Sequence, residues 1–66
     1  MKVFDLITYD MVKNISHGEE LKVNDEYVLY HYTEDDLIVL VKEDEWEEVA
    51  TVLYDDLTQS IEFEIC

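Results

Sequence analysis

The sequence contains no proline and no arginine, and only one glycine and one cysteine in 66 residues. The single cysteine, Cys66, excludes an internal disulfide and fits a reducing compartment. Without a glycine-rich loop or a guanidinium group, two usual means of holding a phosphate are missing. The longest unbroken apolar run, 37–41, is far shorter than the roughly 20 residues of a membrane helix. We therefore expect a cytoplasmic protein without a nucleotide or other cofactor.

Negative charge dominates what is present. Four lysines stand against eighteen acidic residues, which gives a formal net charge of -14. This balance argues against binding to nucleic acid or to an anionic membrane through a basic surface. The hydrophobic content of 48% is too high for a disordered chain, so we expect residues 1–66 to form a single acidic domain.

Residues 4–16 carry apolar side chains at steps of three and four, which places them on one side of a helix. These side chains are Phe4, Ile7, Met11 and Ile15. We predict one N-terminal amphipathic helix that starts at Asp5 or Thr8 and is stopped by Gly18 in a left-handed conformation. A short strand at 2–7, followed by a helix from Thr8, fits the same pattern.

After Gly18, short β-branched and aromatic runs alternate with acidic pairs, which is typical of antiparallel strands joined by tight turns. The predicted strands are 20–24, 26–33, 36–42, 48–54 and 60–65. The breaks contain Asn and Asp, which tolerate hairpin turn geometries. The expected fold class is α+β, with one N-terminal amphipathic helix packed on a small four- to five-stranded antiparallel sheet or partly closed barrel.

The second face of this sheet needs a cover. Residues 27–32 and 37–41 are apolar on both alternating faces, which indicates strands covered on both sides, and one helix covers only one. The second face is closed by the sheet curling on itself, by a second helix, or by another chain in a homodimer. Residues 46–57 also fit a helical stripe, although their β-branched content favours a strand.

No catalytic or metal-binding pattern stands out. The nucleophile candidates are Ser16, Ser60 and Cys66, and their spacing pairs none of them with His17 or His31. We expect His17 to be a cation at a helix end and His31 to be a hydrogen-bonded strand residue rather than a ligand. The acidic runs lack the EF-hand pattern, and no Cys/His cluster has zinc spacing. The sequence thus predicts neither an enzyme nor a metal site.

The acidic residues gather at the predicted turns. They are Asp25 and Glu26; Glu34, Asp35 and Asp36; Glu43, Asp44, Glu45, Glu47 and Glu48; and Asp55 and Asp56. Because alternate turns of a meander share one end of the sheet, we expect one acidic end at 25–26 and 43–48 and another at 35–36 and 55–56. Trp46 lies within one of these runs and is a candidate apolar anchor for a partner.

The charge density invites comparison with nucleic acid. A compact chain of this length spans roughly 28 Å, and duplex DNA carries roughly 16 charges over that distance. In size and charge the chain resembles the small acidic inhibitors that bacteriophages make against host nucleases, restriction and CRISPR effectors or DNA-repair enzymes. Uracil-DNA glycosylase inhibitors are one such group, but their Glu-Ser-Ile element is matched only by Gln59-Ser60-Ile61, without the acid, so no site residue is carried over.

These observations predict a binding protein that presents carboxylates in place of phosphates and blocks a basic nucleic-acid-binding protein such as a nuclease, a polymerase or a repair enzyme. If the chain is viral, it acts in the host cytoplasm. The expected contact residues are Glu34, Asp35, Asp36, Glu43, Asp44, Glu45, Trp46, Glu47, Glu48, Asp55 and Asp56. The alternative is a structural or assembly protein that associates with itself through the spare apolar sheet face, with the acidity serving solubility.

Overall fold

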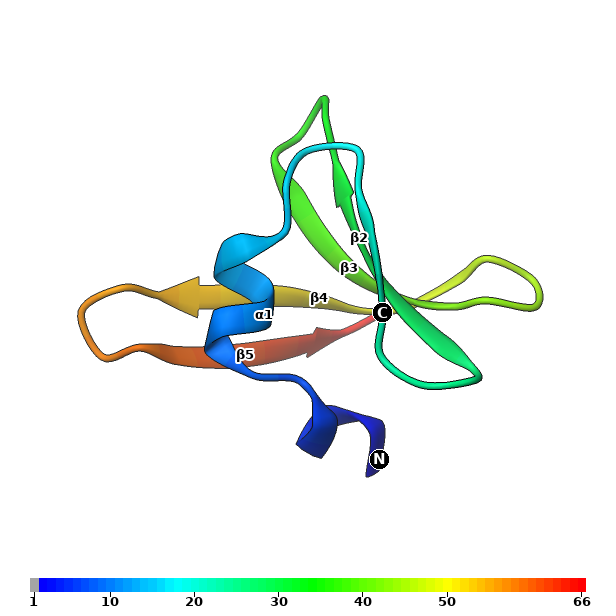
Figure 1. Ribbon diagram of the computed structural model, residues 1–66, viewed down its shortest axis with the longest axis horizontal. Coiled ribbons are helices and arrows are strands. Elements are labelled where there is room, and N and C mark those ends of the chain that lie inside the picture. Colours follow the sequence, from blue (N-terminus) through cyan, green and yellow to red (C-terminus); the bar gives the residue numbers. More distant parts are fainter. Residues whose placement is uncertain (1) are drawn as a thin grey trace.

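The computed structural model describes residues 2–66. Its elements are a 3-10 helix η1 (Lys2–Leu6), a helix α1 (Tyr9–Asn14) and the strands β1 (Glu20–Lys22), β2 (Tyr27–Tyr32), β3 (Leu37–Lys42), β4 (Glu47–Asp55) and β5 (Ser60–Ile65). The strands form one antiparallel sheet in the order β1-β2-β3-β4-β5, and α1 packs against β4 (Figure 1). Because β1 and β5 are both free edges, the sheet is open and the partly closed barrel is not formed.

The predicted continuous helix at 4–16 is wrong, because extended backbone separates two short helical segments. Thr8 has φ -114° and ψ 161°, and its Oγ1 accepts a hydrogen bond from the Met11 amide at 3.3 Å. This is N-cap geometry, so α1 begins at the position that the second sequence alternative indicated, with η1 in place of the expected strand. The four apolar side chains of the predicted stripe nevertheless all pack in the core.

Gly18 adopts the predicted left-handed conformation, with φ 79°. It does not stop the helix, because α1 ends at Asn14 and is followed by Ile15 in an extended conformation. Gly18 instead lies in the connection to β1, where its amide donates to the carbonyl oxygen of His31 at 2.7 Å. This bond fastens the α1–β1 connection to the end of β2.

The five predicted strands are confirmed, each end within two residues of its expected position. Residues 46–57 contain β4 rather than a second helix. The β2–β3, β3–β4 and β4–β5 connections each end in a residue with positive φ: Asp36 at 52°, Trp46 at 54° and Gln59 at 54°. A left-handed residue at the end of a short loop turns the chain into the next strand without splaying the hairpin.

A β-bulge bends the middle of the sheet. Leu40 faces Ala50 while Val41 faces Glu48, so Val49 is the extra residue. A bulge of this kind increases the local twist. In Figure 1 the β2–β3 hairpin consequently runs across the direction of the β4–β5 hairpin.

The two faces of the sheet carry separate apolar cores. On the helix side, Leu29, Ile38, Leu40, Ala50 and Val52 pack with Val3, Ile7, Val12 and Ile15. On the opposite side, which we call the open face, Val28, Val39 and Val41 are buried under Tyr30, Tyr32 and Leu37. The two-sided burial predicted for β2 and β3 is therefore confirmed, and aromatic side chains of the sheet itself close the second face. Within residues 2–66, no helix is long and apolar enough to cross a membrane.

Candidate functional site

All eighteen acidic residues of the chain are exposed. Only Asp36 and Asp56 form ion pairs within residues 2–66, with two histidines and with Lys13 respectively. The other sixteen carboxylates have no cationic partner in the described chain. The surface is thus a largely uncompensated field of negative charge, which attracts cationic groups over about one Debye length.

The strong twist separates the acidic turns. In Figure 1 the β2–β3 and β4–β5 connections point to different corners of the molecule, so the acidic end predicted from 35–36 and 55–56 is not formed. The acidic end predicted from 25–26 and 43–48 is formed in part, because the Glu43 amide donates a hydrogen bond to the Glu26 carbonyl oxygen at 2.8 Å. The carboxylates therefore surround the sheet and do not line up along one side of it.

The open face contains an acidic hollow. It has a volume of about 230 Å³ and is lined by Tyr32, Asp35, Leu37, Val39, Glu48 and Thr51. The Tyr32 hydroxyl donates to Glu48 Oε2 at 3.3 Å. Burial raises the pKa of this hydroxyl above its ordinary value, and the negative charge of Glu48 raises it further. Two carboxylates thus lie beside an apolar floor and a tyrosine ring.

Trp46 stands at the end of the β3–β4 connection and leans on the open face. Its ring meets Tyr30 edge-on at a centroid distance of 5.6 Å, and Tyr30 meets Tyr32 in the same way at 4.8 Å. Trp46 remains 39% exposed. The predicted anchor residue is therefore held by neighbouring rings while part of its surface is available to a partner.

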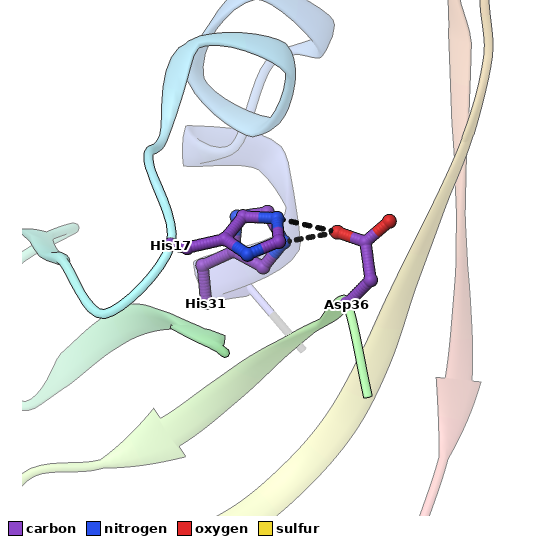
Figure 2. Close-up of side chains that lie close together, drawn as sticks. All are labelled: His17, His31 and Asp36. Atoms are coloured by element: carbon purple, nitrogen blue, oxygen red, sulfur yellow. Dashed lines mark hydrogen bonds and ion pairs between the residues drawn. The ribbon is translucent and has the colours of Figure 1, made fainter. Parts of the chain in front are cut away.

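A second cluster joins His17, His31 and Asp36 on the helix side of the β2–β3 hairpin (Figure 2). His17 comes from the α1–β1 connection, His31 from β2, and Asp36 from the β2–β3 connection. The Nε2 atoms of His17 and His31 lie 2.9 and 2.7 Å from the same oxygen, Asp36 Oδ1. The imidazole centroids are 4.1 Å apart. Three chain segments therefore bring three ligand-type side chains to one point.

Hydrogen bonding orients the His31 ring. Its Nδ1 lies 3.1 Å from the carbonyl oxygen of Ile15, which can only accept, so Nδ1 carries a proton and donates. His31 is buried at 7% exposure, whereas His17 and Asp36 are exposed. The hydrogen bond from His31, aided by the nearby His17, lowers the pKa of the Asp36 carboxyl. The expectation of a hydrogen-bonded strand residue at position 31 is confirmed, whereas His17 lies beyond the helix end and does not cap it.

A third contact ties the β4–β5 connection to α1. Asp56 Oδ1 accepts hydrogen bonds from Lys13 Nζ and from the Tyr9 hydroxyl. These two donors, Lys13 first, lower the pKa of Asp56, and the Asp56 carboxylate raises the pKa of both donors. Asp56 and Asp36, both predicted to face a partner, are thus engaged within the chain.

The contact between His17 and His31 was not predicted, although the sequence contains a signal for it. The predicted antiparallel pairing joins strands 20–24 and 26–33. If this pairing continues toward the start of the first strand, residue 18 lies beside the end of the second strand. The observed register, with Glu20 opposite Tyr30, places the turn that contains His17 next to His31.

Comparison with protein-family models, curated proteins and solved structures finds no match. The function of the site therefore has to be inferred from its own chemistry.

Proposed function

We propose that this protein binds a basic nucleic-acid-binding protein of the cytoplasm and occupies the surface that nucleic acid would otherwise use. The observation that carries the proposal is the exposure of all eighteen carboxylates, sixteen of them without an ion-pair partner in residues 2–66. A surface of this kind speeds association with a cationic cleft and makes binding steeply dependent on salt. The same charge disfavours contact with nucleic acid itself.

The acidic hollow supplies a specific contact for such a partner. A lysine or arginine side chain entering it would lay its carbon stem on Leu37 and Val39 and bring its charge to Asp35 and Glu48. The Tyr32 ring offers a further cation–π contact. Both carboxylates belong to the contact residues expected from the sequence.

The remaining expected contacts lie at different corners of the molecule. Because Asp36 and Asp56 form ion pairs within the chain, we no longer count them among the contact residues. The remaining contact residues are Glu34, Asp35, Glu43, Asp44, Glu45, Trp46, Glu47, Glu48 and Asp55. Trp46 adjoins the open face, and aromatic residues of this kind are enriched among interface hot spots. We therefore centre the interface on the open face and its β3–β4 edge.

Affinity capture tests this function. The immobilised protein is exposed to bacterial lysate, and bound proteins are eluted first with short duplex DNA and then with salt. We expect a nucleic-acid-binding protein to elute with the DNA, because the two ligands compete for one cleft. If DNA releases nothing, the proposal is wrong. A homodimer in sedimentation together with no DNA-released partner would favour self-association through the open face.

Paired variants then test the hollow. Asp35→Asn with Glu48→Gln removes two charges inside it, and Asp5→Asn with Asp25→Asn removes two exposed charges elsewhere. We expect at least tenfold weaker binding of the DNA-released partner for the first pair and a small change for the second. Equal losses would show that only net charge matters and that the hollow is not the contact.

A further inference from the structure

The geometry points to a binding site for one zinc-like divalent cation formed by His17 Nε2, His31 Nε2 and a carboxylate oxygen of Asp36. These three residues offer ligand atoms that all lie within 4.8 Å of one another. Imidazole nitrogen and carboxylate oxygen are the donors that Zn²⁺ accepts, commonly as three protein ligands with a fourth position left to water. Nothing in the acidic hollow takes part, so this site is independent of the proposed function.

The hydrogen bond made by the other ring nitrogen of His31, Nδ1, favours this assignment. A metal-ligating histidine usually donates its other ring N–H to a carbonyl or carboxylate, which fixes the tautomer and aims the lone pair at the metal. His31 Nδ1 makes this contact with the Ile15 carbonyl oxygen at 3.1 Å. The lone pair of Nε2 is then directed at the point where His17 and Asp36 converge (Figure 2).

The two distances from Asp36 Oδ1 require only a small adjustment to admit the ion. With zinc–ligand bonds of about 2.1 Å, ligand atoms of a tetrahedral site are about 3.4 Å apart. The present separations from Asp36 Oδ1 are 2.9 and 2.7 Å, so an ion would push the carboxylate outward by about half an ångström. Asp36 and His17 are exposed and free to move by this amount, whereas buried His31 holds its position. An ion bound here would be coordinated by the lone pairs of both Nε2 atoms, and these bonds would replace the present contacts of both atoms with Asp36.

Excess magnesium makes the test selective. The other carboxylates bind hard cations weakly, and Mg²⁺ prefers oxygen ligands to imidazole, so millimolar Mg²⁺ saturates the acidic surface and spares the His site. Zn²⁺ is titrated into the protein under this condition by calorimetry. We expect one Zn²⁺ per chain. No saturable uptake in the presence of Mg²⁺ would overturn the proposal.

His17→Ala identifies the ligands without disturbing the core, because His17 is exposed and contacts Asp36 from a surface turn. We expect at least tenfold weaker Zn²⁺ binding with an unchanged circular dichroism spectrum. The matched control is Glu34→Gln with Asp35→Asn, which removes neighbouring charges outside the cluster and should bind as the wild type. Wild-type affinity in His17→Ala, or equal losses in both variants, would show that surface charge alone holds the ion.

Nitrogen-15 NMR of the histidine rings gives a second readout that does not depend on affinity. On Zn²⁺ addition the Nε2 resonances of both histidines should shift, and His31 Nδ1 should stay protonated. Ring nitrogens that remain unchanged at saturating Zn²⁺ would place the ion elsewhere and overturn the assignment.

Discussion

The contact between Trp46 and Tyr30 holds Trp46 on the open face, and its strength can be measured in the free protein. Tyr30 packs on the buried valines of that face and meets both Tyr32 and Trp46 edge-on. We predict that Tyr30→Ala lowers the free energy of unfolding by about 2–3 kcal/mol, somewhat below the cost of removing a fully buried aromatic ring. Trp46→Ala should cost about 1 kcal/mol, since an aromatic pair is worth about that much beyond its buried area.

A double-mutant cycle measures the pair itself. We expect the two single losses to exceed the loss of the double variant by about 1 kcal/mol, because each single variant already removes the Tyr30–Trp46 contact. A chain of 66 residues has a free energy of unfolding of roughly 3–10 kcal/mol, so Tyr30→Ala should remain measurable in mild conditions.

Urea unfolding followed by far-ultraviolet circular dichroism suits this cycle, because tryptophan fluorescence is lost in two of the variants. Leu57→Ala serves as the control, since Leu57 is 95% exposed and its truncation should change stability by less than about 0.5 kcal/mol. A coupling free energy below about 0.3 kcal/mol would refute the reasoning and show that Trp46 does not pack on Tyr30 in solution.

Three further predictions concern charge and backbone strain. Sodium chloride should raise the thermal unfolding midpoint, since screening weakens repulsion among the sixteen carboxylates that have no ion-pair partner in residues 2–66; a flat or falling midpoint would contradict this. The folded-state pKa of Asp56 is lowered by Lys13 and Tyr9, so its contribution is complete above the unfolded pKa and is lost as pH falls through the folded one. The stability gap between wild type and Asp56→Asn, from urea unfolding at several pH values, should therefore narrow toward low pH, and a constant gap would argue against the contact. Gln59→Gly should stabilise the protein by up to about 1 kcal/mol in urea, because φ at Gln59 is 54°, whereas Thr58→Gly, whose φ is not in the left-handed region, should destabilise it; the opposite order would refute the argument.

Four of the strands were predictable because each is short and bounded by turn residues, whereas residues 46–57 fitted a helical stripe as well and only their β-branched content favoured β4. Residues 61–65 alternate apolar and acidic side chains, and β5 has the predicted bounds, 60–65. The helix was not predictable as one element, because spacing reports which side chains face the core and not whether the backbone between them is continuous. Phe4 and Ile7 pack in the core although they lie before α1. The extended backbone of Thr8 separates the helical segment that precedes it from α1, which contains Met11.

The sequence named the two carboxylates of the acidic hollow as candidate contacts but did not predict how they are arranged, and it did not predict the histidine cluster. The sequence indicated that Asp35 and Glu48 face a partner, yet their meeting around one hollow depends on the bulge that turns Glu48 to the open face. Asp36 was expected to face the same partner and instead bonds to His31. The direction of an exposed side chain depends on neighbours that are distant along the chain, which local patterns do not report.

The sequence by itself determined the excess of negative charge, the five strands with their turns, and the need to cover both faces of β2 and β3, since composition and period-two patterning act locally. Only the tertiary structure decided that aromatic side chains close the open face, that the acidic turns diverge, and that His17 meets His31. These features follow from strand register and from the twist added at the Leu40–Val41 bulge, which are set by long-range packing.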